Sequence, residues 1–198
     1  MSILVDRAIE NAGLDDVLVK RREGRERTID VSRLRGADLL VLGALADRIR
    51  AEEVGPQVRI VTAAICSEPG VATVPPGGVE MTGLELLRRV AILRLTGSRG
   101  ATVRVDFGRC GLELAQIALG FGANELMGRI VSKSGAAFAE GALMGVGKKS
   151  RLELADIVKR REIEGFVRLA GREPVFVDEM GRSETSAEPC AEEDGSWS

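Results

Sequence analysis

The sequence predicts an α/β fold, a partial (β/α) barrel with parallel strands, about three βα units and flanking helices. Residues 102–107 alternate β-branched and charged side chains, as a half-buried strand does. Residues 112–121 then place apolar side chains at helical spacing, and residues 126–131 can return as a further strand. Strand, helix and strand joined by short glycine turns form the repeating unit of a parallel sheet, whether open or closed into a barrel.

The composition allows one ordinary domain and narrows the class of protein. The chain has 198 residues, 44% of them hydrophobic, but only 3% aromatic, so its core must be aliphatic. A net charge of -2 argues against a nucleic-acid binder, which would show a basic face. No apolar run approaches the roughly twenty residues of a membrane span, and the N-terminus does not resemble a secretory signal. We therefore expect a cytoplasmic protein that binds neither nucleic acid nor membrane.

The residue types available for catalysis are limited. The chain has no histidine, which is the commonest general base and transition-metal ligand. Its three cysteines, Cys66, Cys110 and Cys190, stand far apart and form no CxxC pair, so we expect neither a disulfide framework nor a metal site. Any chemistry must use carboxylates, lysines, lone thiols or a borrowed cofactor, which counts against a self-sufficient enzyme.

The first third of the chain predicts two helices, a charged segment and a strand. Residues 2–11 form a short amphipathic pattern, and residues 15–32 are charge-rich, as a solvated face or loop is. Residues 36–53 predict a strong helix, with Asp38 in its first turn, where a carboxylate complements the helix dipole. Residues 57–65 read as a buried strand of a parallel sheet.

A proline- and glycine-rich stretch separates this strand from the next helix. Residues 66–79 hold three prolines and three glycines, which predicts a loop or linker. Thr82 is expected to cap the following helix, over residues 84–95, with Glu85 as its capping-box partner.

The C-terminal third is less regular. Residues 134–147 are rich in small residues and predict a loosely packed helix and a glycine loop, or a surface that another chain covers. Ser150 is expected to cap a last helix over residues 151–170, followed by an extended piece at 174–177. Residues 181–198 are acidic and polar, and we expect them to be disordered.

Four segments together resemble a known family. In chain order they are GADLLVLGALADRIR, TGLELLRRVAILRL, LELAQIALGFGANELMGRIV and KRREIEGFVRLAGREPVFVD. They are similar to the segment before the cluster motif, and to the later segments, of radical S-adenosylmethionine enzymes of the futalosine menaquinone pathway (aminofutalosine synthase and dehypoxanthine futalosine cyclase) and of the related deazaflavin-precursor synthases. The family's final "AGR-P-V" stretch corresponds here to Ala170, Gly171, Arg172, Pro174 and Val175. The resemblance covers most of residues 36–178.

The chain departs from this family where the family holds its iron–sulfur cluster. That cluster needs a CxxxCxxC triplet, because three thiolates bind three irons and leave the fourth for S-adenosylmethionine. Here only Cys66 lies in the corresponding region, and the middle of the family's fold is missing. Ser132 and Lys133 stand where the family tends to carry acidic residues. The resemblance therefore transfers no catalytic residue to this chain.

The resemblance implies a division into three parts and a function. Residues 1–35 are an N-terminal helix and charged segment, residues 36–180 a degenerate radical-SAM-like partial barrel, and residues 181–198 an acidic tail. The implied function is a catalytically degenerate binding or partner subunit linked to menaquinone or related cofactor biosynthesis. It would act as a homo-oligomer or with a complementary radical SAM chain. It would hold no cofactor of its own, and S-adenosylmethionine and an iron–sulfur cluster would be present only if a partner chain supplied them.

Two alternatives remain open. The chain could complete a radical SAM active site across an interface, as one part of a split enzyme. It could also be a small nucleotide-binding α/β protein. In that case Gly145, Gly147, Lys148 and Lys149 would bind phosphate near a helix N-terminus, although they lack the full P-loop spacing.

Other candidate residues have simpler structural explanations. Residues 120–124 could bind a phosphate, but a helix C-cap and turn explains them better. Asp106 and Glu113 flank a turn at the expected C-terminal edge of a strand, where solvated carboxylates are common. Cys66 and Cys110 fall near strand ends, and buried structural thiols are commoner than reactive ones.

Overall fold

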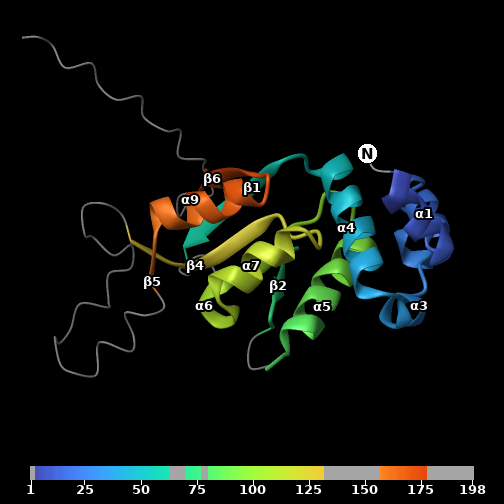
Figure 1. Cartoon of the computed structure of the whole chain (residues 1–198), viewed down its shortest axis with the longest axis horizontal. Coiled ribbons are helices and arrows are strands. Elements are labelled where there is room, and N and C mark those ends of the chain that lie inside the picture. Colours follow the sequence, from blue (N-terminus) through green and yellow to red (C-terminus); the bar gives the residue numbers. More distant parts are fainter. Residues whose placement is uncertain (1–2, 63–69, 77–79, 132–156, 178–198) are drawn as a thin grey trace, which may run out of the picture.

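The computed structural model describes residues 3–62, 70–76, 80–131 and 157–177 (Figure 1). Its elements follow in chain order: α1 (Ile3–Asn11), α2 (Asp15–Arg22), the 3-10 turn η1 (Glu26–Thr28), α3 (Val31–Gly36), α4 (Leu39–Glu53), β1 (Gln57–Thr62), β2 (Ala72–Val74), α5 (Gly83–Thr96), β3 (Val103–Asp106), α6 (Phe107–Cys110), α7 (Leu112–Leu119), β4 (Glu125–Val131), β5 (Ile157–Lys159), α9 (Arg160–Leu169) and β6 (Glu173–Phe176).

The strands form a parallel sheet, which confirms the predicted α/β class. Their order is β2-β3-β4-β1-β6, and the last residues of β4 also pair with β5. Every pairing is parallel. Strand β1 lies between β4 and β6 rather than beside β2, and the described strands do not close into a barrel. Because β2 and β6 are the outer strands of this order, the sheet has two different edges.

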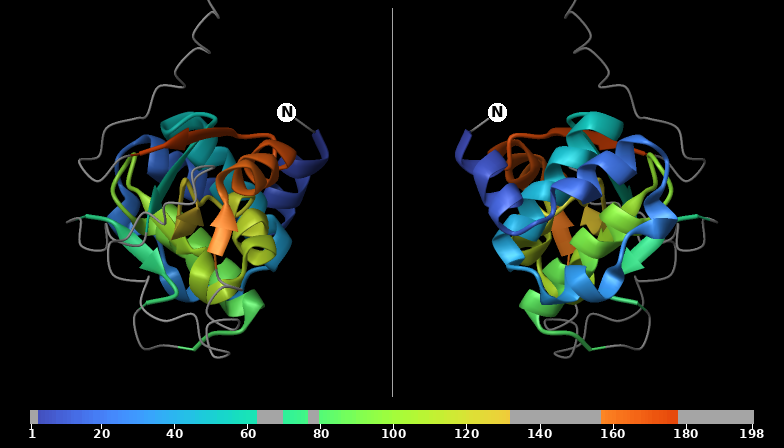
Figure 2. Two further views of the ribbon diagram at one scale, coloured as in Figure 1. Left: turned by 90° about the vertical axis from the view of Figure 1, so that its left-hand side faces the viewer. Right: turned by 90° about the vertical axis from the view of Figure 1, so that its right-hand side faces the viewer.

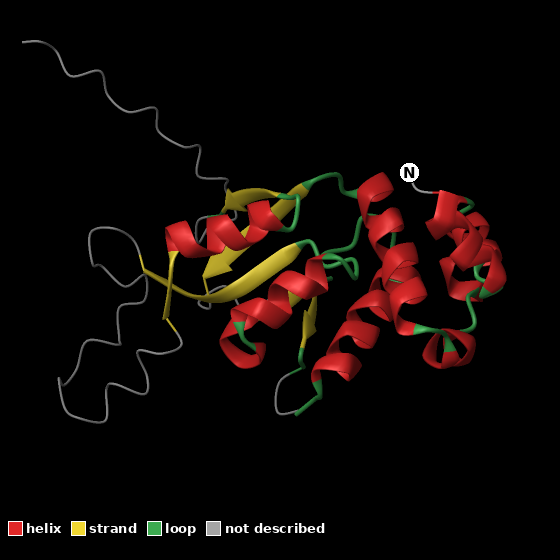
Figure 3. Ribbon diagram, viewed as in Figure 1, coloured by secondary structure: helices red, strands yellow, loops and turns green. Residues whose placement is uncertain are grey.

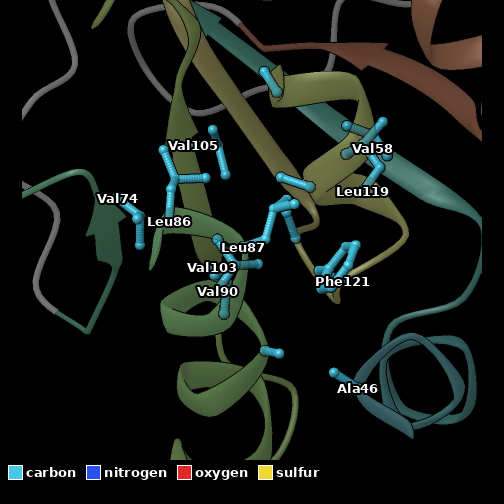
Figure 4. Packing of buried hydrophobic residues seen from close by; sticks show 14 of the residues in the cluster. Ala46, Val58, Val74, Leu86, Leu87, Val90, Val103, Val105, Leu119 and Phe121 are labelled. Atoms are coloured by element: carbon cyan, nitrogen blue, oxygen red, sulfur yellow. The ribbon is translucent and has the colours of Figure 1, made fainter. Parts of the chain in front are cut away.

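One layer of helices covers one face of the sheet. Helices α5, α7 and α9 lie in front of the strands in Figure 1, and Figure 2 (left) shows them on the same side of the sheet. The alternating apolar residues of the strands, such as Val58, Val105 and Leu126, belong to one core with residues of α4, α5, α7 and α9. In Figure 4, Val103 and Val105 of β3 lie close to Leu86 and Leu87 of α5. Crossovers on one face are the arrangement found in (β/α) barrels.

The predicted helix boundaries are largely confirmed, because their signals are local. The Asp38 carboxylate accepts hydrogen bonds from the N–H groups of Leu40 and Val41 at the start of α4. Thr82 and Glu85 form the predicted reciprocal capping box of α5. Gly122 follows α7 with a φ of 98°, a conformation that only glycine adopts at little cost.

The charged segment was wrongly predicted to be a solvated face or loop. Residues 15–32 contain α2, η1 and the start of α3, grouped at one end of the molecule in Figure 3. Val17 and Leu18 are buried in the core. These few apolar positions are enough to dock the helix, since its charged residues point outward or pair with α4.

Two short strands also differ from the prediction. The proline- and glycine-rich stretch contains β2, which pairs with β3 at Ala72–Val74. The prolines lie outside these three paired residues, so they remove no ladder hydrogen bond. In the described part of the helix predicted over 151–170, residues 157–159 form β5 instead, and α9 begins at Arg160. Val158 pairs with Ile130 of β4, and this pairing overrides the helical pattern that the sequence carries there.

Several predictions fall outside the described residues. They concern the small-residue stretch 134–147, the Ser150 cap and the acidic tail 181–198. Among the helices that are described, none combines the length and apolar character needed to cross a membrane.

Candidate functional site

The N-terminal ends of the strands are filled by buried arginines that bind backbone. Arg94 is fully buried and donates to the carbonyls of Gly122 and Ala101 at 2.9 and 2.7 Å, and to Asn124 Oδ1 at 2.6 Å. Asn124 Oδ1 also accepts the N–H of Val103 at 2.8 Å. Burial lowers the pKa of the Arg94 guanidinium to about 10, which still leaves it charged at neutral pH. This edge of the sheet is therefore built for stability.

A second arginine ties the N-terminal helices to the same edge. Arg21 of α2 donates to both oxygens of Glu53 at the end of α4, at 2.8 and 2.9 Å. It also donates to the carbonyls of Gly97 and Ser98, which follow α5. The Glu53 carboxylate in turn accepts the N–H of Gly100 at 2.9 Å. Three separate segments are held together by one buried ion pair.

The face of the sheet opposite the helices is the candidate functional site, and we call it the open face. The strand registers place the following described residues on it: Arg59 and Val61 of β1; Thr73 of β2; Arg104 and Asp106 of β3; Glu125, Met127 and Arg129 of β4; Lys159 of β5; Glu173 and Val175 of β6, with Val177 beyond it. Val61, Met127 and Val177 form an apolar cluster of their own, to which no described helix contributes a residue.

A row of three charged residues crosses the open face. Arg104, Glu125 and Arg59 are register partners on the neighbouring strands β3, β4 and β1. Arg104 Nε donates to Glu125 Oε1, and Arg59 Nη1 lies 3.0 Å from Oε2 in an ion pair that is not aligned as a hydrogen bond. Glu125 and Arg104 are buried, whereas the Arg59 side chain keeps 34% of its surface exposed. A buried carboxylate between two guanidinium groups fixes the position of both.

The next row towards the C-terminal strand ends carries Asp106 beside Met127 and Val61. Asp106 is half-buried and accepts the N–H of Gly108 at 3.0 Å as the N-cap of α6. Desolvation is the largest effect on its carboxyl group and raises its pKa above the usual value. In α/β proteins, ligands bind near the C-terminal ends of the strands, so Asp106 borders the expected site.

Helix α6 is fixed next to this position. Arg109 Nη1 donates to the carbonyls of Pro75 and Pro76 at 2.9 and 2.8 Å, which ties α6 to the end of β2. Burial, with a smaller effect of Asp106, raises the pKa of the Cys110 thiol to about 11. A thiol with this pKa stays protonated at neutral pH and is a poor nucleophile, as expected of a structural cysteine.

The other sequence candidates have mixed outcomes. Residues 120–124 form the predicted C-cap and turn, and Asn124 serves the Arg94 network. Glu113 is exposed in the first turn of α7, as predicted, whereas Asp106 is half-buried rather than a solvated turn carboxylate. Cys66 and Cys190 lie outside the described residues. The possible phosphate loop, Gly145, Gly147, Lys148 and Lys149, lies outside them too.

The charged row was not found from the sequence. Each of its members stands in an apolar strand, as in VRVD of β3 and QVRIVT of β1. The sequence shows that the two charged residues of β3, and likewise those of β4, are an even number of residues apart, so that they lie on one face of the strand. Register decides whether such charges meet, and register between strands joined by long crossovers is not visible in the sequence.

Comparison with known proteins adds no relative. No family model matches the chain, and no curated protein matches it. Within the described parts of the chain, no group of three His, Cys, Asp or Glu side chains could hold a metal ion.

Proposed function

We propose that this chain is a binding subunit whose working surface is the open face, and that it assembles with a second copy of itself. In this proposal it is a catalytically degenerate relative of the radical SAM enzymes that it resembles, with a role linked to menaquinone or related cofactor biosynthesis. Its half-barrel sheet becomes complete only across the interface.

The observation that carries the proposal is that the described helices packed on the sheet all lie on one of its faces. Helices α5, α7 and α9 all pack on one face, and the charged row of the open face lies on the other. In open sheets with helices on both faces, both sides are core, whereas one-sided crossovers leave an inner face to line a barrel. Charged residues on that inner face favour the binding of a polar molecule there.

The two sheet edges support self-assembly. Strands β2 and β6 are the outer members of the described order, and they run parallel to each other. A two-fold axis along the strand direction would place β6 of each copy beside β2 of the other and keep all strands parallel. Such an arrangement closes the ring and covers both edges of the described sheet, where the outer strands present their backbone hydrogen-bonding groups.

The positions of the four resembling segments in the structure also support the proposal. The four resembling segments fall on α4, on α5, on α7 with β4, and on α9 with β6. They are therefore successive helix and strand units of one sheet rather than scattered matches.

The test is the native mass of the full chain, purified without oxygen from its own host, with the co-purifying chains and the iron content determined. We expect a dimer without iron. A Val175→Glu variant should become monomeric, because Val175 lies in β6 at the edge of the open face, whereas Ile117→Glu on the exposed side of α7 should remain dimeric. A stable wild-type monomer would overturn the proposal. A stable complex with a cluster-bearing chain would instead make this protein part of a split enzyme.

A further inference from the structure

Two neighbouring helices of the layer leave apolar side chains on their outer surface. Helices α7 and α9 lie side by side (Figure 1), and Gln116 Nε2 of α7 donates to the carbonyl of Phe166 in α9 at 2.9 Å. Ile117 follows Gln116 and keeps 52% of its surface exposed, and Leu169 at the end of α9 keeps 82%. Among the described residues, no large hydrophobic side chain is more exposed than that of Leu169.

The exposed side of α9 carries both charged and apolar groups. Four exposed residues recur there at a spacing of three to four, and we call them the α9 stripe: Arg161, Gly165, Arg168 and Leu169. Gly165 has no side chain, and a Cβ placed there would meet no neighbouring heavy atom within 4 Å. The stripe therefore has a notch, open to solvent, between its arginines and its leucine.

The arginines of the α9 stripe are accessible to a ligand of opposite charge. The guanidinium groups of Arg161 and Arg168 form no hydrogen bond or ion pair with other described residues. Glu164 of α9 instead pairs with the residue that begins the helix, at 3.5 Å. Two further carboxylates, Glu162 of α9 and Glu113 of α7, are exposed and do not pair with these arginines.

The C-terminal segment of the chain has the complementary chemistry. Residues 178–198, DEMGRSETSAEPCAEEDGSWS, hold seven carboxylates and one arginine, a net charge of -6. Because the whole chain carries -2, residues 1–177 carry +4. Trp197, the single tryptophan of the chain, closely follows three of the seven carboxylates. One segment thus joins a cluster of negative charge to a large aromatic side chain, and the two match the arginines and the apolar side of the stripe.

This segment also starts close to the stripe. Val177 follows β6, and the guanidinium carbon of Arg160, the first residue of α9, lies 3.8 Å from the centre of the Phe176 ring in that strand. The chain runs twenty residues from Val177 to Trp197, and a flexible chain of that length spans roughly 25 Å on average. The ten residues of α9 span only about 15 Å. Trp197 can therefore reach Leu169 at the far end of α9, and a tether this short favours docking within one chain.

We propose that the acidic C-terminal segment, residues 178–198, folds back onto the α9 stripe. Trp197 packs over the notch against Leu169 and Ile117, and the carboxylates that precede it pair with the two arginines of the stripe. The docked segment covers the apolar side chains of this surface and neutralises its charge, so an acidic partner must displace it in order to bind there. The inference does not rest on the proposed function, because the stripe lies on the helix layer and the proposed dimer forms through the sheet edges.

The experiment follows the fluorescence emission of Trp197 in the full chain and its quenching by acrylamide. The chain has no other tryptophan and no tyrosine, so the signal reports this segment alone. At low ionic strength we expect emission at a shorter wavelength, and weaker quenching, than in the same protein unfolded by urea. Leu169→Ser should move the emission to longer wavelength and strengthen quenching, because the apolar contact is lost. Arg161→Glu combined with Arg168→Glu should do the same by repelling the carboxylates, and sodium chloride should partly reproduce that effect.

Matched controls come from the other end of the molecule (Figure 1). Leu4→Ser removes an apolar side chain of α1 that is 74% exposed, and should leave the Trp197 signal unchanged. Arg7→Glu combined with Arg27→Glu reverses two exposed charges of α1 and η1, and should also leave it unchanged. A wild-type tryptophan that is quenched as readily as in urea would overturn the inference, and so would equal shifts in the stripe variants and the controls.

Dilution separates docking within one chain from docking onto a second copy. The native mass and the Trp197 signal are read on the same dilution series. Protection of Trp197 that persists in the monomer supports the inference, whereas protection that disappears together with a dimer would overturn it. A monomer with a protected tryptophan contradicts only the proposed dimer, and a dimer with an unprotected tryptophan contradicts only the docked segment.

Discussion

Arginines fill both the N-terminal edge of this sheet and its open face, but they are bonded in opposite ways. At the edge, Arg94 and Arg21 each donate to two backbone carbonyls and also to a side chain, Asn124 or Glu53 respectively, so each is locked by several hydrogen bonds. On the open face, Arg104 and Arg59 share one carboxylate, and Arg129 reaches the exposed surface. Guanidinium groups that donate to the carbonyls of several segments hold those segments together, whereas the row on the open face joins neighbouring strands around one buried carboxylate, Glu125. The same residue type therefore gives stability in one region and a charged surface in the other.

The largest expected effect is the loss of the Arg94 network. Arg94→Met would deprive the carbonyls of Gly122 and Ala101 of this donor and would remove one of the two donors to Asn124 Oδ1. We expect a loss of about 3–5 kcal/mol in the free energy of unfolding, measured by urea denaturation. Arg88→Met is the matched control on the same helix, because Arg88 is only half-buried, and it should have a smaller effect. Equal losses in the two variants would contradict the special role of the N-terminal edge.

A smaller loss of stability is expected on the open face. Glu125→Gln keeps the shape of the side chain but leaves the buried Arg104 without its counter-charge in the row. The free energy of unfolding should fall by about 1–3 kcal/mol, and the variant should still fold. Thr73→Ala, which lies on the same face at β2 and beside Arg104 in register, serves as a control that leaves the charged row intact. An unchanged stability in Glu125→Gln would show that this carboxylate does not hold the row.

Asp106 gives a prediction that depends on pH. Because desolvation raises its pKa in the folded protein, ionised Asp106 opposes folding above its unfolded pKa, and this effect vanishes in acid, where both states are protonated. Asp106→Asn should therefore be slightly more stable than the wild type at pH 7, since asparagine can also cap α6. The difference should disappear as the pH falls below the carboxyl's ordinary range. Thermal unfolding across pH checks this, and a variant that is less stable at pH 7 would contradict it.

The comparison also explains which features the sequence could predict. Helices α4 and α5 and strands β1, β3 and β4 were predicted because their period, caps and glycine turns are local signals. Strands β2 and β5 were missed because each has only three residues and exists through pairing with a longer neighbour. The Arg94 network and the charged row were missed for a related reason. Both join residues of different elements, and the register or packing that brings them together is a property of the whole fold.

The smallest expected effect sharpens the contrast most directly. Arg129→Gln removes a charge of the open face that no described ion pair holds, so the free energy of unfolding should stay within about 0.5 kcal/mol of the wild type. Set beside Arg94→Met, it compares an arginine of helix α5 at the N-terminal edge of the sheet with an arginine of β4 by the same urea titration. If Arg129→Gln costs as much as the buried variant, Arg129 belongs to the structural network after all. If its stability is unchanged, the charge of Arg129 contributes nothing measurable to folding, in contrast to that of Arg94.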